Sequence, residues 1–353
     1  MPSSRGWKAI ELIELSLCIP GLLGPPAGIE PAEIDLPALP ALCRMLSRAD
    51  RDRGPRDLFE ALAGLGGYPR GALPVARLRY LGQIGGMGGP GQLLCADPVH
   101  LRADRDRVLL FDADLNATAA EAQALCAAFN AFEADSGMRL ECVTPEHWYL
   151  HLPAAAGITT TPLPDARGRD IDPLLPTGRE SCRWHALLNE WQMLLFQQPV
   201  NQQRQQAGRP MINGVWLWGE GELVDGRTEF KALWADDPLV QGIGRHLSVN
   251  TRPLPADPAH WLASVGPGRH WVHLPGLLQP LAYRDLEHWS RAVKELEAAW
   301  FQPLLAAVSS GRVKQINLLP CAGTDYRYQP RHRFRFWRRD KSFSAYICND
   351  QQT

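Results

Sequence analysis

The chain has 353 residues, with 37 Lys and Arg against 38 Asp and Glu and a formal net charge of −1. This balance excludes a global electrostatic field that would recruit nucleic acid or an anionic membrane, so any such contact must be local. A chain of this length is typical of two domains, or of one large α/β unit with an insertion.

The first apolar run, residues 10–19, predicts a buried strand, because the sequence PGLLGPP that follows forces a loop. Glu11 and Glu14 interrupt this run and no small-residue cleavage site follows it, so we do not expect a signal peptide. No run of about eighteen apolar residues occurs, so we expect a cytoplasmic protein without a membrane span.

The next segments alternate between helix and loop patterns. Residues 36–50 predict a short helix, and the glycine-dense residues 82–91 predict a flexible connector and a domain boundary. Residues 100–115 read as a strand and residues 138–153 as a pair of strands, which together indicate a compact α+β block.

Two helices of this block carry clear signals. Thr118 with Glu121 three residues later has the spacing of a capping box, and Gly137 closes the segment that it opens. In residues 179–198, large apolar residues recur at helical spacing, so we expect them to form one packed face. These residues are Trp184, Leu187, Leu188, Trp191, Leu194 and Leu195.

The second half of the chain alternates strands and helices, which favours a parallel sheet flanked by helices and hence an α/β fold. Residues 212–217 predict a buried strand that re-enters this main sheet. The loop Gly219 to Gly221 lets backbone amides approach an anion, or simply ends the strand. The later segments are a helix at 236–247, a strand at 270–276, a helix at 283–308 and a strand at 313–321.

The eight cysteines are scattered without a C-x-x-C pair, which is typical of reduced thiols that pack as small hydrophobic side chains. Near the C-terminus, arginines and aromatics alternate over residues 331–337, which predicts a strand with one basic and one aromatic face. Such a strand can bind single-stranded nucleic acid or can protect a sheet edge, and we favour the edge strand.

Metal ligands are hard to assemble from this sequence. His270 and His273 stand three apart on a strand and face opposite sides, whereas Asp285 and His288 stand three apart on a helix and share a face. Two ligands do not make a site, so we predict no metal and no other cofactor.

Four stretches in this order, within residues 94–110, 157–178, 187–221 and 236–247, resemble the RpfE-type regulatory proteins of proteobacteria. Those proteins look like divergent relatives of the archaeal-type cofactor-independent phosphoglycerate mutases, in the alkaline-phosphatase-like superfamily. The resemblance implies a phosphatase-like α/β core, residues 1–90 plus 208–353, with an inserted smaller α+β domain, residues 91–207. It also implies two divalent metals held by aspartates and histidines, and a serine that carries phosphate.

The chain departs from that pattern at each place where the resemblance implies a metal ligand. Cys18 to Gly21 stands where the mutases have an Asp-Gly turn, and no serine nearby is placed as a nucleophile. After the last core strand the sequence reads NLLPCAGTD, where an Asp-His pair is expected. Losing most direct ligands should abolish two-metal phosphoryl transfer.

Three functions follow as alternatives. The first is a catalytically degenerate regulatory protein that binds a small molecule or a protein partner. The second is an active metal-dependent mutase or phosphatase, and the third is a nucleic-acid module that uses Arg331 to Arg339. The second would draw its ligands from Asp236, Asp237, Asp285, His288 or Asp325.

We favour the first function, without nucleic acid or membrane as a partner. An arginine can grip a carboxylate or phosphate, asparagines fix orientation, and tryptophan offers a stacking face. In the opposing interpretation the asparagines cap local turns and the tryptophans are core. The predicted ligand-binding residues are Asn201, Arg204, Asn213, Trp216, Trp218 and Glu220.

Overall fold

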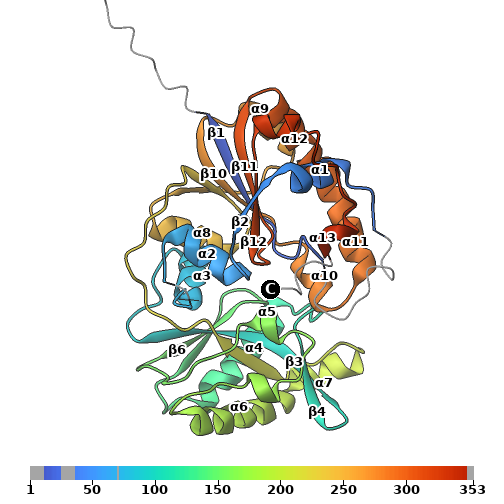
Figure 1. Cartoon of the computed structure of the whole chain (residues 1–353). Coiled ribbons are helices and arrows are strands. Elements are labelled where there is room, and N and C mark those ends of the chain that lie inside the picture. The colour runs from blue at the N-terminus through green and yellow to red at the C-terminus, as the bar shows by residue number, and fades with distance from the viewer. Residues whose placement is uncertain (1–11, 25–35, 70, 348–353) are drawn as a thin grey trace, which may run out of the picture. The chain divides into compact units, whose positions relative to one another are not determined.

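The computed structural model describes residues 12–24, 36–69 and 71–347, which group into two compact units (Figure 1). Unit 1 comprises Met1–Gly67, Arg227–Asp237 and Leu247–Thr353, and unit 2 comprises Tyr68–Gly226 and Pro238–His246. The division expected from the sequence, 91–207 against the rest, stays a proposal about which segments fold together.

Unit 1 is built on a seven-stranded sheet in the order β2-β12-β11-β1-β10-β8-β9. The pairs from β11 through β1, β10 and β8 to β9 are parallel, and β12 and β2 add two antiparallel strands at one edge. The strands are β1 (Ile13–Cys18), β2 (Asp50–Arg53), β8 (Ala232–Trp234), β9 (Asn250–Arg252), β10 (Gly268–His273), β11 (Val313–Leu319) and β12 (Thr324–Tyr328). A mostly parallel α/β sheet, as predicted, is confirmed.

Most helices of unit 1, with α2 and η4 as exceptions, bury apolar side chains in one core with this sheet. Leu15 and Leu17 of the central strand β1 are fully buried, as a strand with neighbours on both sides requires. The helices are α1 (Pro40–Arg48), α2 (Leu58–Gly66), α9 (Pro258–Ser264), α10 (Leu278–Ala282), α11 (Leu286–Leu296), η3 (Glu297–Phe301), α12 (Gln302–Ser309), η4 (Pro330–Phe334) and α13 (Ser344–Ile347).

Unit 2 holds an antiparallel sheet in the order β4-β3-β6-β5, with β7 also paired to the long strand β3. Its strands are β3 (Gln92–Asp104), β4 (Arg107–Phe111), β5 (Arg139–Cys142), β6 (Trp148–Leu152) and β7 (Gly214–Trp218). Its helices are α3 (Val75–Ile84), α4 (Ala119–Phe132), α5 (Leu163–Ala166), η2 (Asp172–Leu174), α6 (Ser181–Phe196), α7 (Pro199–Gln206) and α8 (Pro238–His246).

The strand at residues 212–217 does not re-enter the main sheet, so that prediction is wrong. β7 pairs antiparallel with β3 over Gly214 to Trp218, within the sheet of unit 2. All five residues of β7 are buried. A uniformly apolar strand satisfies any interior sheet position, so its composition could not distinguish the two sheets.

Predictions in unit 2 that rest on residues close together in the sequence agree with the structure. Thr118 and Glu121 form a reciprocal capping box at the start of α4, which ends at Phe132 before Gly137 takes a left-handed conformation. In α6, Trp184, Trp191 and Leu195 of the predicted stripe are buried, and Leu187 and Leu188 are partly buried against the same core. Leu194, the sixth predicted residue, is half-buried and is not part of that core.

The predicted connector at 82–91 begins too early, because α3 continues to Ile84. Gly82 lies against α8, where a Cβ atom would stand 1.8 Å from the carbonyl oxygen of Pro238. Gly242 of α8 is equally close to α3, with a Cβ position 1.6 Å from the carbonyl oxygen of Leu78. The two glycines therefore let the helix backbones touch.

The arginine-rich segment is not the predicted strand. β12 ends at Tyr328, and Pro330–Phe334 forms the short 3-10 helix η4. Proline removes the N–H that would continue the ladder, so the alternation of arginine and aromatic residues reflects no sheet face. Among the described residues, no helix has both the length and the apolar content needed to cross a membrane.

Candidate functional site

The carboxyl ends of the parallel strands in unit 1 meet at one edge of the sheet, where open α/β sheets place their sites. Cys18 ends β1 and stands in register with His273, which ends β10. Cys18 also stands in register with Leu319 of β11, two residues before Cys321. Asp236 and Asp237 follow β8 at the same edge.

Two thiols meet at this edge. The Sγ atoms of Cys18 and Cys321 lie 3.7 Å apart although 303 residues separate them in the chain. Cys18 is fully buried, and burial raises the pKa of its thiol well above the usual range, with the neighbouring Cys321 raising it further. The thiol of Cys18 is therefore protonated and neutral at physiological pH.

His273 is a buried imidazole without a hydrogen-bonding partner. It is 1% exposed, and neither ring nitrogen has a hydrogen-bond partner among the described residues. Burial lowers the pKa of His273, while the carboxylate of Asp237 acts in the opposite direction. An unsatisfied buried polar group costs about 1 to 3 kcal/mol, so the side chain of His273 lowers the stability of the folded state.

Asp325 on β12 adds a carboxyl group with an abnormal pKa. Burial, together with the carboxylate of Asp52, raises the pKa of Asp325 to about 7. Its Oδ1 atom has no hydrogen-bond partner among the described residues. At neutral pH this carboxyl group is therefore partly protonated.

The donor set of this edge does not fit the pair of hard divalent ions that the resemblance implies. Such ions take several oxygen or imidazole ligands. Asp237 and His273 carry atoms of these kinds, but a thiol stands at the end of β1 and another in the loop after β11. Over residues 12–24, 36–69 and 71–347, no three His, Cys, Asp or Glu side chains are grouped to hold a metal ion.

The predicted helical pair has a structural role. Asp285 is the N-cap of α11 and accepts a hydrogen bond from the backbone N–H of His288 at 3.0 Å. Both side chains are more than half exposed.

The six predicted ligand-binding residues lie in unit 2, and their polar atoms contact neighbouring protein groups. Asn201 is buried and bridges the carbonyl oxygens of Leu195 and Ile212, each at 2.8 Å. Arg204 is also buried and pairs with Glu121 at 3.0 Å.

The other four predicted residues lie along and around β7. Trp218 donates to Asp97 at 2.7 Å, and Asn213 exchanges two hydrogen bonds with the backbone of Leu101. The remaining two, Trp216 and Glu220, both hold the segment at 160–161, since Trp216 Nε1 donates to the carbonyl of Thr161 and Glu220 accepts from the backbone of Thr160. The structure therefore brings Trp216 and Glu220 to one segment, while Asn201 and Arg204 brace a different part of the unit.

Asp97 is the centre of a buried polar network behind β7. Arg79 forms a bidentate ion pair with it, both N–O distances being 2.7 Å, and Tyr149 accepts from Arg79 at 2.9 Å. A buried pair with matched hydrogen bonds fixes one arrangement of its neighbours. Trp218 is thus a buried structural residue, as in the opposing interpretation of the sequence.

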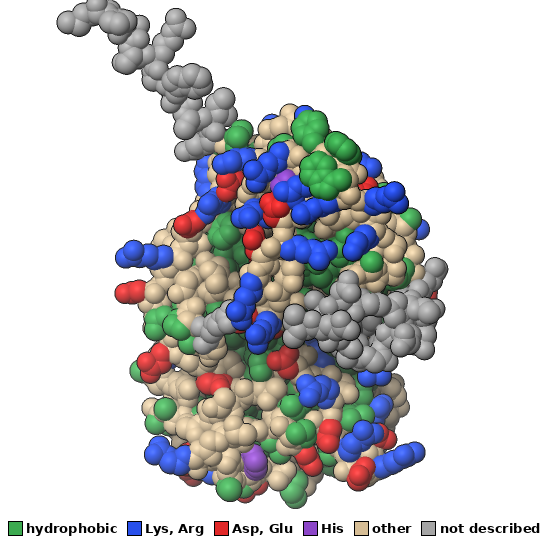
Figure 2. All heavy atoms as spheres, in the orientation of Figure 1, with side chains coloured by type: hydrophobic (Ala, Val, Ile, Leu, Met, Phe, Trp, Pro, Cys, Tyr) green, Lys and Arg blue, Asp and Glu red, His purple; other side chains and the backbone are tan. Residues whose placement is uncertain are grey.

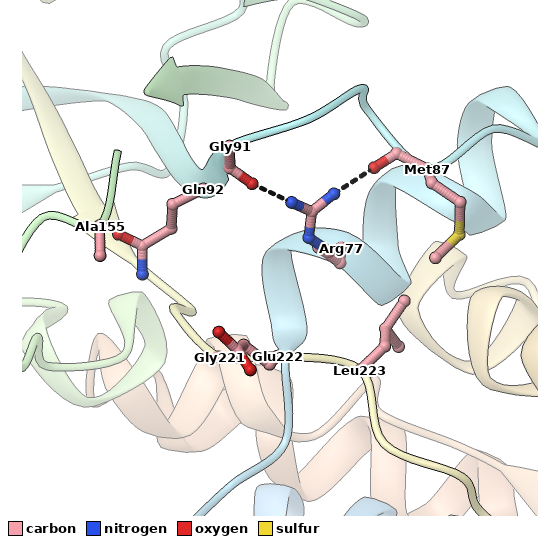
Figure 3. Close-up of a pocket in the computed structure, with 8 residues that line it drawn as sticks. All are labelled: Arg77, Met87, Gly91, Gln92, Ala155, Gly221, Glu222 and Leu223. Atoms are coloured by element: carbon pink, nitrogen blue, oxygen red, sulfur yellow. Dashed lines mark hydrogen bonds between the residues drawn. The ribbon is translucent and has the colours of Figure 1, made fainter. Parts of the chain in front are cut away.

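Next to the loop after β7 lies a cavity of about 430 Å³. Arg77 points toward it from α3 and donates to the carbonyl oxygens of Met87 and Gly91 (Figure 3). Sequence reasoning missed this cavity, although an arginine beside a glycine-dense loop was a usable signal. The residues lining it are Arg77, Met87, Gly91, Gln92, Ala155, Gly221, Glu222 and Leu223.

The C-terminal aromatic residues of unit 1 are exposed rather than packed on an edge strand. Phe334, Phe336 and Trp337 are 60%, 81% and 68% exposed. In Figure 2, hydrophobic side chains lie beside Lys and Arg side chains around the end of unit 1 that carries α9 and α12. Several arginines of this C-terminal segment interact with other parts of unit 1. Arg335, for example, forms an ion pair with Asp50 at 2.6 Å.

Comparison with known proteins points to one group of enzymes, while no protein-family model matches the chain. A stretch of 135 residues is 30% identical to the 2,3-bisphosphoglycerate-independent phosphoglycerate mutase of Methanosarcina acetivorans and covers 34% of each chain. A stretch of 94 residues is 35% identical to a probable enzyme of the same description from Geobacter sulfurreducens, covering 25% of this chain and 24% of that one.

Among solved structures, the cofactor-independent phosphoglycerate mutase of Thermoplasma acidophilum aligns over 90% of both chains, with 18% identity and a TM-score of 0.43. The chain matches about a third of the length of the first of these curated relatives and about a quarter of the second. It is a distant relative of the archaeal-type cofactor-independent phosphoglycerate mutases over that part.

Proposed function

We propose that this protein is a catalytically degenerate relative of the cofactor-independent phosphoglycerate mutases, of the RpfE regulatory type, that binds a small molecule or a protein partner. The observation that carries the proposal is the contact between the thiols of Cys18 and Cys321, 3.7 Å apart at the carboxyl edge of the main sheet. The resemblance implies aspartate at the first of these positions.

The chemistry of these side chains supports the proposal. A mutase of this kind needs two cations to neutralise charge on the transferring phosphoryl group. Here a buried thiol, Cys18, takes the place of the aspartate that the resemblance implies, and burial raises its pKa so that it carries no charge to hold a hard cation. Replacing even a supporting group of a metal site typically costs about 10 to 100-fold in affinity or activity.

We further propose that a small-molecule ligand is held in unit 2, around the loop that follows β7. The cavity of about 430 Å³ there lies within the range of small-molecule sites. Gly221 and Glu222 line it directly after Glu220, which belongs to the predicted ligand set. The lining residues do not include Asn201, Arg204, Asn213, Trp216 or Trp218, so in this proposal those five residues do not contact the ligand.

To test whether the protein is catalytically degenerate, bound metal and turnover are measured on the purified full chain. The substrates are 2-phosphoglycerate, 3-phosphoglycerate and a general phosphomonoester. We expect no stoichiometric manganese or zinc and no turnover above the buffer rate. Stoichiometric metal together with turnover that His273→Ala removes would overturn the proposal, and would support the alternative of an active mutase or phosphatase.

The test of ligand binding uses thermal shift with the two phosphoglycerates and other small phosphorylated metabolites. We expect at least one to raise the melting temperature of the wild type and of the exposed control Glu287→Gln. The same shift should be lost in Gln92→Ala. An equal shift in all three proteins would remove the cavity from the proposal while leaving the question of catalysis untouched.

A further inference from the structure

We propose that Cys18 and Cys321 are a site of reversible oxidation, forming an intramolecular disulfide when the protein meets a small-molecule disulfide such as oxidised glutathione. This inference is independent of the proposed function, because it depends only on the two thiols and the strands that carry them. Their Sγ atoms, 3.7 Å apart, already lie within hydrogen-bonding distance for sulfur.

The two strands hold the thiols in position. β1 and β11 are direct neighbours, and the backbone N–H of Ile19 donates to the carbonyl oxygen of Leu319 at 2.9 Å. This bond ties the residue after Cys18 to the residue two before Cys321. A disulfide has an S–S length of about 2.05 Å, so the sulfurs must approach by roughly 1.7 Å.

The loop after β11 is the part that can supply this movement. Cys321 has a φ of +59°, in the left-handed region that non-glycine residues seldom occupy, and Gly323 follows with a φ of +86°. A residue in a loop lacks the ladder hydrogen bonds that fix a residue inside a strand, so Cys321 has more freedom to move than Cys18. Cys18, at the end of a central strand, stays in place.

The two cysteines differ in exposure, and this difference determines which thiol reacts first. Cys321 is half-buried, whereas Cys18 is fully buried, so the incoming disulfide meets Cys321 first. The Cys321 thiolate attacks one sulfur, the S–S bond of the reagent breaks, and one small thiolate leaves. The Cys18 thiolate then attacks the sulfur of Cys321, and the second small thiol leaves.

Atoms and electrons balance in this sequence. The two protein thiols lose their protons and are oxidised to one disulfide, and the reagent is reduced to two thiols that carry those protons. The raised pKa of Cys18 slows the second step, because only the thiolate attacks. We therefore expect the mixed disulfide at Cys321 to precede the internal bond.

A second cysteine pair provides a comparison inside the same molecule. In unit 2, Cys126 is buried and Cys142 is half-buried, and each thiol affects the pKa of the other. Cys182 is exposed and serves as the reference for an unhindered thiol. Any experiment must therefore identify which cysteines become linked, not only how many thiols disappear.

The test exposes the full-length protein to increasing oxidised glutathione and maps linked peptides by mass spectrometry. We expect a peptide that joins Cys18 to Cys321, and its loss on reduction with dithiothreitol. Cys182→Ser, the matched control, should form the same link. In Cys18→Ser we expect a stable glutathione adduct on Cys321, because no second thiol displaces it.

Two results would overturn the proposal. In one, glutathione saturates Cys182 in the wild type while Cys18 and Cys321 remain thiols. In the other, Cys321 of the wild type keeps its glutathione or links to a different cysteine. Because the wild type alone yields both results, the conclusion does not depend on whether the serine variants fold.

Discussion

Asp325 lies directly opposite Asp52 across the antiparallel pair of β12 and β2. Two carboxyl groups in register repel one another when both are ionised, and like charges directly opposite destabilise a sheet. Burial is the larger cause and this repulsion adds to it, so the pKa of Asp325 rises to about 7 from a usual value of 3.8. Arg327, beside Asp325, pairs with Asp52 at 3.2 Å and partly offsets the repulsion.

The shift predicts how stability depends on pH. The folded state keeps the Asp325 proton up to about pH 7, whereas the unfolded chain loses it near pH 3.8. Between these values the unfolded state binds fewer protons, so this group lowers stability as pH rises.

We expect Asp325→Asn to be more stable than the wild type at pH 8, by on the order of 1 kcal/mol once solvent screening is allowed for. The gain should shrink toward pH 4. Thermal melts at both pH values, with the exposed Asp106→Asn as control, measure it. A gain that does not change with pH would contradict the assignment.

Glu297 caps the start of α1 and so links two segments of unit 1 that are far apart in the sequence. Its buried carboxylate accepts the backbone N–H groups of Ala41 and Leu42, at 2.7 and 3.0 Å, at the start of α1. Negative charge at a helix N-terminus satisfies unpaired donors there.

We expect Glu297→Ala to lower the free energy of unfolding by about 2 to 3 kcal/mol, since hydrogen bonds to a charged group are lost. Urea denaturation of the variant beside Glu287→Ala, whose side chain is exposed, checks this. Equal midpoints for the two variants would show that the cap contributes nothing.

Gly242 lies where α8 packs closely against α3, and the space there admits no larger side chain. A Cβ atom there would stand 1.6 Å from the carbonyl oxygen of Leu78, and backbone cannot move aside cheaply. We expect Gly242→Ala to destabilise the protein by about 1 to 3 kcal/mol or more.

The matched control is Gly64→Ala in α2, where a Cβ atom meets nothing within 4 Å. Alanine favours helix over glycine by about 1 kcal/mol, so this change should stabilise the protein. Melting temperatures that move in opposite directions support the interpretation, and a Gly242→Ala protein as stable as the wild type refutes it.

The C-terminal arginines test the nucleic-acid alternative. Arg335 pairs with Asp50, Arg338 donates to the carbonyl of Ala49 at 2.8 Å, and Arg333 donates to the carbonyl of Ser309 at 3.0 Å. Because these groups are engaged in holding the segment, we expect no salt-dependent binding to single strands.

Fluorescence anisotropy with labelled oligonucleotides, read at several salt concentrations, measures this. Binding that weakens with salt, and weakens again in Phe336→Ala or Trp337→Ala, would favour the alternative. Those two side chains are exposed, so their replacement leaves the packing of unit 1 in place.

The candidate site was only partly predictable. The sequence located the end of β1 and the segment after β11, and the resemblance identified the departures from metal ligands there, since each depends on residues within one short stretch. The contact of Cys18 with Cys321 could not be predicted, because nothing local to either cysteine indicates that β1 and β11 are neighbours. The cavity beside Gln92 also depends on three separate segments.

The sequence by itself determined the helices and strands whose signals are local, such as the Thr118 and Glu121 capping box and the apolar stripe of α6. It also determined the α/β class, through the alternation of apolar strands with helices. Tertiary structure decided which sheet receives β7 and how closely Gly82 and Gly242 bring two helices together. The physical reason is that the hydrophobic effect is non-directional: it requires a strand to be apolar but does not specify which strand or helix it packs against. Caps and turns, in contrast, are specified by residues within a few positions of one another.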